Sequence, residues 1–231
     1  MPVNNLLKLK NNKMKLNKYI SLLLAIMIML SCKKSELKND TGNLAEELKG
    51  SVWAGEFRYT VGASQELQPF SIMLNNDGTL TWTDFQNSRP GGTWLIDGNK
   101  ISLRFLNGTT NSADITKEQW SNFSNPAGNG FEIENISRSA IPALASLQQT
   151  TWTGSLINSV WGSYDGALHF NSGKTVTVIS NGYSEDDTYT VEGAGIKTSN
   201  YGYFIFLNNA TNVKGYNHYS DIDVTWNLTR Q

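Results

Sequence analysis

The sequence has few of the side chains that build metal centres, redox centres and catalytic sites. Its 231 residues include one cysteine and two histidines, His169 and His218. A lone cysteine forms no disulfide within the chain, and two separate histidines without cysteine partners do not make a zinc site. The glycines lie in turn-like dipeptides rather than between a strand and a helix, so no phosphate-binding loop is predicted. We therefore expect no metal, no cofactor and no catalytic residue, and hence no enzyme.

Basic charge is scarce outside the N-terminus. Five of the 19 basic residues lie within the first 31 positions, so residues 32–231 carry 14 basic side chains and all 20 acidic ones. This excess of acid, without any dense basic stripe, argues against nucleic acid as a partner. The acids include two groups, Glu185–Asp187 and Asp221 with Asp223. Both are expected to be solvated, rather than to form a catalytic carboxylate pair or a calcium loop.

The N-terminus has the two physical parts of an export signal. Five lysines and no acid occur up to Lys18, and an apolar run follows from Tyr19 to Leu30. A basic segment followed by an apolar one is typical of a secretory signal. The run is shorter than the roughly 20 apolar residues that a membrane-spanning helix needs. Residues 1–31 are therefore predicted to be a signal peptide.

The residues that end this run resemble the lipobox of bacterial lipoproteins. Met29-Leu30-Ser31-Cys32 places a small residue directly before the one cysteine. The resemblance implies cleavage before Cys32 and attachment of acyl chains such as palmitate, which would make the membrane a partner of the chain. The expected location is the cell envelope, at the outer membrane, with the periplasmic or surface face left open. Residues 32–42 are polar and are predicted to form a flexible tether.

The remaining sequence has the two-residue hydrophobic period of half-buried β-strands. Apolar and polar residues alternate in four clear segments, which lie at 70–74, 79–83, 101–105 and 222–228. Dipeptides that tolerate positive φ are predicted to be tight turns: Asp77-Gly78, Asp97-Gly98, Asn107-Gly108, Asn129-Gly130, Asp165-Gly166 and Asn181-Gly182. Many short strands joined by hairpins predict a mostly β fold, an antiparallel meander that closes into a barrel or pairs into a sandwich.

Short helices are expected to connect these strands. Asn43 and Glu46 have the spacing of a capping box, which predicts a helix over Leu44–Lys49. Thr116–Gln119 has a similar spacing and predicts a second helix, which would carry Trp120 and Phe123 on one face. Pro142 is expected to open a third helix with Leu144 and Leu147.

The chain also repeats itself. Trp53-Ala-Gly55, preceded by Leu48, matches Trp152-Thr-Gly154, preceded by Leu147, at an offset of 99 residues, and further matches follow in the same order. Two β-meander modules are predicted, at 43–138 and 139–231. The unit of a short helix, Trp-x-Gly and a meander resembles the lipocalin-like lipoproteins of Gram-negative bacteria. The resemblance implies antiparallel barrels, structural roles for these tryptophans and glycines, and a binding rather than a catalytic activity. One large barrel remains the alternative.

Seven tryptophans suggest both a core and a binding surface. Five are expected to pack in the core, namely Trp53, Trp82, Trp94, Trp152 and Trp226. Trp161 lies in a loop-like stretch, and with Tyr183, Tyr201 and Tyr203 it is a candidate ligand-binding residue. We expect a non-catalytic binding module for a small apolar ligand held in a barrel. The alternatives are a glycan- or protein-binding lipoprotein that uses exposed aromatics, and an envelope scaffolding component.

Overall fold

The computed structural model describes residues 41–60, 66–124, 131–207, 211–219 and 222–231, which belong to one compact unit, Asp40–Gln231. The predicted signal peptide 1–31, the lipid attachment residue Cys32 and nearly all of the predicted tether 32–42 lie outside the described residues. So do Asp221 and the predicted turn Asn129-Gly130. Within the described part of the chain, no helix is both long and apolar enough to cross a membrane.

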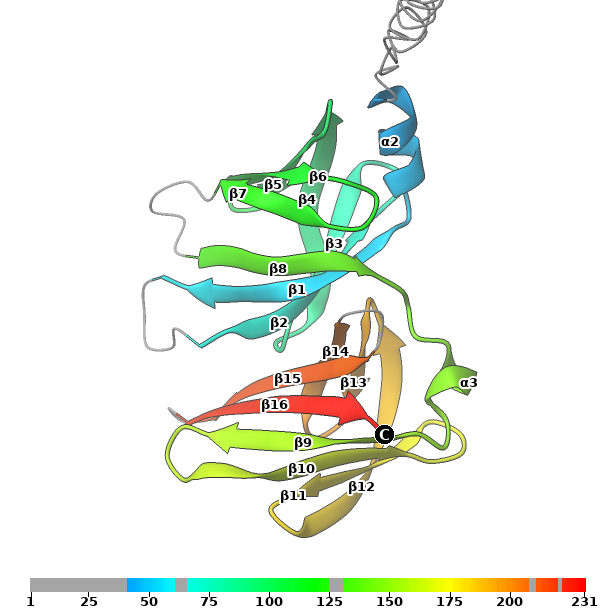
Figure 1. Ribbon diagram of the computed structural model, residues 1–231, viewed down its shortest axis with the longest axis vertical. Coiled ribbons are helices and arrows are strands. Elements are labelled where there is room, and N and C mark those ends of the chain that lie inside the picture. The colour runs from blue at the N-terminus through cyan, green and yellow to red at the C-terminus, as the bar shows by residue number, and fades with distance from the viewer. Residues whose placement is uncertain (1–40, 61–65, 125–130, 208–210, 220–221) are drawn as a thin grey trace, which may run out of the picture. The chain divides into compact units, whose positions relative to one another are not determined.

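The first half of this unit forms an eight-stranded antiparallel sheet that curls towards a barrel (Figure 1). The strand order is β7-β6-β5-β4-β3-β2-β1-β8, so consecutive strands are neighbours from β1 to β7. The two edge strands meet at one isolated bridge, between Gln119 and Ser137. The strands are β1 (Val52–Tyr59), β2 (Gln68–Leu74), β3 (Thr79–Thr83), β4 (Ser88–Asp97), β5 (Lys100–Phe105), β6 (Thr110–Ile115), β7 (Trp120–Ser124) and β8 (Phe131–Ser139).

The second half forms a closed eight-stranded barrel, because its first strand pairs with both the second and the last. Its strands are β9 (Thr151–Asn158), β10 (Gly162–Phe170), β11 (Thr175–Ser180), β12 (Tyr183–Glu192), β13 (Gly195–Thr198), β14 (Gly202–Leu207), β15 (Asn212–Tyr219) and β16 (Ile222–Arg230). The predicted mostly β, antiparallel fold with barrel-like sheets and short helices is confirmed.

Two of the three predicted helices are present. Helix α2 (Thr41–Leu48) begins before the expected start at Leu44, and α3 (Leu144–Leu147) follows Pro142 as expected. The helix predicted at Thr116–Gln119 is wrong. The hydroxyl of Thr116 does accept the backbone N–H of Gln119, at 3.1 Å, but this bond closes a turn and Trp120 then starts strand β7. A hydroxyl that caps a helix closes such a turn equally well, so the local pattern did not distinguish the two.

The predicted turns show a similar mixture of outcomes. Gly78, Gly98, Gly108 and Gly182 all have positive φ and lie in hairpins, as the sequence indicated. Asp165-Gly166 is instead part of strand β10. There a Cβ on Gly166 would lie 3.0 Å from the ring of Trp226, so this glycine makes room for a large interior side chain.

Each sheet begins with the same set of hydrogen bonds. The indole N–H of Trp53 donates to the hydroxyl of Ser51 at 2.8 Å, and that hydroxyl donates to the carbonyl of Leu48. In the second sheet the indole of Trp152 donates to the hydroxyl of Thr150 at 3.0 Å, and this hydroxyl donates to the carbonyl of Leu147. Both tryptophans are completely buried, so these hydroxyls satisfy indole donors that have no access to water.

The glycine two residues after each tryptophan allows a neighbouring strand to approach closely. A Cβ on Gly55 would lie 2.9 Å from the Cα of Ile136 in β8. A Cβ on Gly154 would overlap the backbone oxygen of Asn227 in β16. Both glycines therefore lie in the first strand of their sheet, at a point where the last strand in sequence pairs closely with it.

Alternation along the strands fills a separate core inside each sheet. Leu48, Trp53, Phe70 and Ile72 belong to the first core, and Leu147, Trp152, Phe206 and Trp226 belong to the second. All five tryptophans expected in the core are at most 8% exposed.

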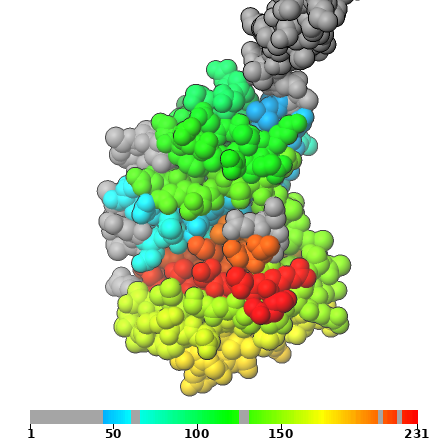
Figure 2. Space-filling view, in the orientation of Figure 1, coloured from blue at the N-terminus to red at the C-terminus, as the bar shows by residue number. Residues whose placement is uncertain are grey.

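The outer face of β1 and β2 packs against β14 and the turn between β12 and β13. Val52 and Ala54 of the first sheet form an apolar cluster with Ala194, Ile205 and Leu207 of the second. An ion pair between Glu56 and Lys214 joins β1 to β15. Figure 2 shows the orange and red strands β15 and β16 next to the cyan segment of the first sheet. The two sheets are therefore packed together rather than joined by a linker alone.

A candidate ligand cavity and an aromatic rim

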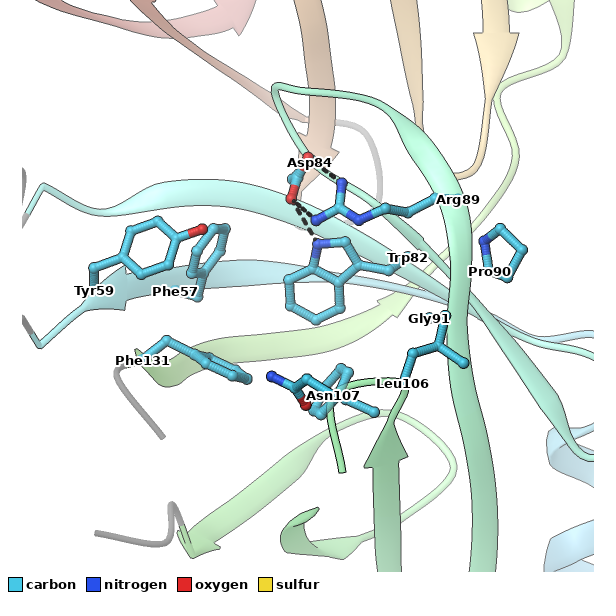
Figure 3. A pocket seen from close by; sticks show the side chains of 11 residues that line it. Phe57, Tyr59, Trp82, Asp84, Arg89, Pro90, Gly91, Leu106, Asn107 and Phe131 are labelled. Carbon is cyan, nitrogen blue, oxygen red and sulfur yellow. Dashed lines mark hydrogen bonds and ion pairs between the residues drawn. The ribbon is translucent and has the colours of Figure 1, made fainter. Parts of the chain in front are cut away.

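A cavity of about 340 Å³ opens in the first sheet (Figure 3). This volume lies within the range of about 300–1,000 Å³ that small-molecule sites occupy. Strands β1, β3, β4, β5 and β8 contribute to its wall. The residues that line it are Phe57, Tyr59, Trp82, Asp84, Arg89, Pro90, Gly91, Phe105, Leu106, Asn107 and Phe131.

Aromatic rings form most of the apolar wall. Trp82 stacks on Phe70 beneath it, with ring centroids 4.4 Å apart and planes 9° from parallel. Phe57 and Phe105 each approach Trp82 edge to face, with centroids 5.6 Å away. Phe131 in turn packs edge to face on Phe105 at 5.5 Å. Stacked and edge-to-face contacts hold such rings in fixed orientations, so the wall is largely formed before any ligand enters.

The cavity has one polar edge, made by Asp84 and Arg89. The guanidinium of Arg89 donates to both carboxylate oxygens of Asp84, at 3.0 and 2.7 Å. The indole N–H of Trp82 donates to the same carboxylate at 2.9 Å, as Figure 3 shows. The Asp84 side chain is 2% exposed and that of Arg89 is 40% exposed. The buried carboxylate is thus fully engaged, and the outer side of Arg89 faces solvent at the edge of the cavity.

The surroundings of Arg89 and Tyr59 shift the pKa of both side chains upwards. The hydrogen bonds to Asp84 raise the pKa of Arg89, so the guanidinium remains charged. Burial raises the pKa of Tyr59, and the negative charge of Asp84 adds to this effect while Arg89 opposes it. The Tyr59 hydroxyl therefore stays protonated and is a neutral donor at the mouth.

The cavity mouth exposes apolar surface. Leu106 is 76% exposed and Tyr59 is 36% exposed. Among the described residues, no group of three histidine, cysteine or acidic side chains has the arrangement of a metal site. The cavity is thus suited to an apolar ligand, which would pack against the aromatic rings and form hydrogen bonds at the one polar edge.

Three of the four aromatic residues singled out in the sequence meet at a different place, in the second sheet. Trp161, Tyr183 and Tyr201 all line a recess of about 460 Å³. Trp161 and Tyr183 are strongly exposed, on the hairpins β9–β10 and β11–β12. Their convergence was not predictable from positions so far apart in the chain.

Tyr203, the fourth candidate, does not belong to this group. It lies in β14 and is 2% exposed, because its side chain points away from the barrel interior and against the first sheet. Its hydroxyl donates to Glu192 at 2.7 Å and accepts the backbone N–H of Ser88 at 3.1 Å. Tyr203 is therefore buried between the two sheets and does not line the recess.

The acidic groups are more engaged than the sequence indicated. Glu185, Asp186 and Asp187 lie in strand β12, and Asp187 is buried and accepts the backbone N–H groups of Thr188 and Asn200. The carboxylate of Asp223 accepts a hydrogen bond from the hydroxyl of Tyr216, and the backbone N–H of Asp223 donates to the hydroxyl of Ser159 at 2.9 Å. These carboxylates hold turns and strand ends in place.

The cavity residues were missed as a group by sequence reasoning. The sequence predicts Trp82 in the core and does not single out Asp84 or Arg89 as candidates. The one available signal was the pattern Trp82-Thr-Asp84 followed by Arg89 across a short hairpin, where opposite charges close to an indole mark a polar interruption of an apolar face.

Comparison with known proteins gives little to set beside this geometry. No protein-family model matches the chain, and no curated protein matches it. Among solved structures, the chain is similar to the Cpx pathway activator NlpE from Escherichia coli, at 13% sequence identity and a TM-score of 0.27, with 79% of this chain and 95% of that chain covered.

Proposed function

We propose that the protein is a lipid-anchored, non-catalytic binding protein of the cell envelope, which holds a small, largely apolar ligand in the cavity of its first sheet. The observation that carries this proposal is the aromatic wall formed by Phe57, Trp82, Phe105 and Phe131 around an open volume of about 340 Å³. A small barrel whose interior is completely filled holds no ligand, whereas this sheet leaves space at one end.

The polar edge defines the ligand further. Because Asp84 already satisfies Arg89 through two hydrogen bonds, the site offers no uncompensated positive charge to an acid. The Tyr59 hydroxyl and the outer side of Arg89 remain suited to a neutral polar group. The ligand we propose is therefore an apolar molecule with a single neutral hydrogen-bonding end.

The anchor is proposed from the sequence. The segment Met29-Leu30-Ser31-Cys32 has the order of residues that precedes lipid attachment, and multiple acyl chains on Cys32 would hold the protein at the membrane. The outer membrane is the proposed location. A binding site for apolar molecules close to a bilayer would have access to ligands that dissolve poorly in water.

Native mass spectrometry of the full-length chain tests the proposal. In the presence of an excess of the neutral apolar probe N-phenyl-1-naphthylamine, one probe molecule should remain bound per chain and be lost on denaturation. Leu106→Trp should reduce this binding, because the larger ring would obstruct the mouth from an exposed position.

Leu95→Trp is the matched control. Leu95 lies on the same sheet and is also strongly exposed, but it does not line the cavity. It should leave probe binding unchanged. A bare mass at excess probe, or equal binding by both variants, would contradict the proposed site.

A further inference from the structure

The recess of the second sheet has a different chemistry from the cavity of the first. The side chains around it are aromatic, amide, hydroxyl or aliphatic, and none of them carries a charge. They are Leu156, Asn158, Trp161, Tyr164, Ser180, Asn181, Tyr183, Asn200, Tyr201, Asn217, Val224 and Trp226. We propose that this recess is a binding site for a neutral carbohydrate, independent of the apolar cavity.

Trp161 is held in an exposed position by its own backbone. The side-chain oxygen of Asn158 accepts the N–H groups of Val160 at 2.9 Å and of Trp161 at 3.0 Å. From the other side, the hydroxyl of Tyr164 donates to the carbonyl of Trp161 at 2.9 Å. The indole itself is still 67% exposed. A fixed backbone that presents a large exposed ring is the arrangement of a pre-organised binding residue rather than of a packing residue.

Tyr183 and Tyr201 are also fixed. Asn181 and Gly182 both have positive φ, which forms the tight two-residue hairpin that places Tyr183 at its end with 80% of the residue exposed. The hydroxyl of Tyr201 donates to Glu185 at 2.9 Å, and its ring meets Trp226 edge to face. Three aromatic faces are thus presented from three different connections of the barrel.

The polar lining fits hydroxyl groups. Amide side chains both donate and accept, as the hydroxyl groups of a sugar do, and two exposed amides, Asn181 and Asn200, line the recess. The indole N–H of Trp226 is buried and has no hydrogen-bond partner among the described residues. A buried donor without a partner is costly, and Trp226 is one of the residues that line the recess.

The charge of the surroundings selects a neutral ligand. No lysine, arginine or histidine lines the recess, and Glu185 lies next to it through its bond to Tyr201. Sugars that carry carboxylate or sulfate groups would be repelled by this carboxylate and would find no cation to compensate them. Pyranose rings without charge have apolar C–H faces for the aromatic rings and hydroxyl edges for the amides.

Binding of neutral hexasaccharides tests the proposal. The full-length chain, reconstituted in nanodiscs of phospholipids without sugar headgroups, is titrated by calorimetry with maltohexaose, cellohexaose, xylohexaose and chitohexaose. At least one should bind. Trp161→Ala and Tyr183→Ala should each weaken that binding about tenfold or more, since each removes one stacking face.

Val160→Ala is the matched control, because Val160 is exposed in the same hairpin and does not line the recess. It should bind as the unmodified chain does. Binding by none of the four sugars, or equal binding by Trp161→Ala, would overturn the proposal, as would preference for an acidic hexasaccharide or a peptide over all neutral ones. Leu106→Trp in the other sheet should leave sugar binding unchanged, so the two proposed sites fail separately.

Discussion

The backbone N–H of Ser88 donates to the hydroxyl of Tyr203 at 3.1 Å, which joins the β3–β4 hairpin of the first sheet to strand β14 of the second. The same hydroxyl donates to Glu192 at 2.7 Å. Next to this link, Phe85 of the hairpin packs edge to face on Tyr216 with centroids 4.8 Å apart. The hairpin that contains the buried Asp84 is thus held in place by the neighbouring barrel.

Replacing Tyr203 by phenylalanine tests the importance of this link. At pH 7 the free energy of unfolding should fall by about 1–2 kcal/mol, because Glu192 and Ser88 each lose a hydrogen-bond partner. Urea unfolding followed by tryptophan fluorescence measures this change. A stability equal to that of the unmodified chain would mean that the packing of the two sheets does not depend on this bond.

The same variant predicts a change at alkaline pH. Burial, reinforced by the Glu192 carboxylate, raises the pKa of Tyr203 above its ordinary value near 10. Above about pH 10 the unfolded chain therefore loses this proton while the folded chain keeps it, so stability declines as pH rises. Tyr203→Phe should make that decline shallower. Burial also raises the pKa of Tyr59 and Tyr189 in both proteins, so the difference between the two curves, rather than either curve alone, is the readout.

Replacing the glycine of each Trp-x-Gly motif by alanine should lower the free energy of unfolding by different amounts. A Cβ on Gly154 would overlap a backbone oxygen of β16, whereas a Cβ on Gly55 would lie 2.9 Å from the Cα of Ile136. Gly154→Ala should lower the free energy of unfolding by more than about 2 kcal/mol, since overpacking against backbone forces strands apart. Gly55→Ala should cost less, because its added Cβ makes a less severe contact than that of Gly154.

Thermal unfolding compares these variants. Gly78→Ala serves as the control, because nothing lies within 4 Å of its added Cβ and only the positive φ of 82° is strained. If Gly154→Ala were no more destabilising than Gly78→Ala, the close approach of β9 and β16 would not limit barrel closure.

Local patterns in the sequence were enough for the fold but not for the cavity. Alternating residues such as Phe70 and Ile72 correctly indicated a strand with one buried face, because a period of two is a property of the strand itself. Phe57 and Phe131 alternate in the same way, yet they border open space. An inward side chain can contact a side chain from the opposite strand or border an empty space. Which of the two occurs depends on the diameter of the curled sheet, and this is set by all of its strands together.

Tyr203 and Trp161 show the same limit from the outer surface. Alternation along β14 places Tyr203 on the outer face of its barrel. This face is buried because the first sheet packs against it, which the sequence of β14 alone does not reveal. The loop-like position of Trp161 correctly indicated an exposed side chain, because no neighbouring element covers it. The pattern of one strand therefore predicts the exposure of a side chain correctly only where no other element packs on that strand.

Asp84 offers a test of the polar edge of the cavity. Asp84→Asn keeps the shape of the side chain but removes the charge that binds Arg89 and the indole of Trp82. The free energy of unfolding should fall by about 1–3 kcal/mol, because a buried acceptor of charged hydrogen bonds is weakened. Binding of N-phenyl-1-naphthylamine should weaken as well, since the hydrogen bond that fixes the ring of Trp82 becomes weaker. Asp114→Asn is the control, as its partner Lys100 is largely exposed and such surface pairs contribute little. Equal stability of the two variants would show that the Asp84–Arg89 pair is no more than a surface ion pair, and the cavity would then lack a fixed polar edge.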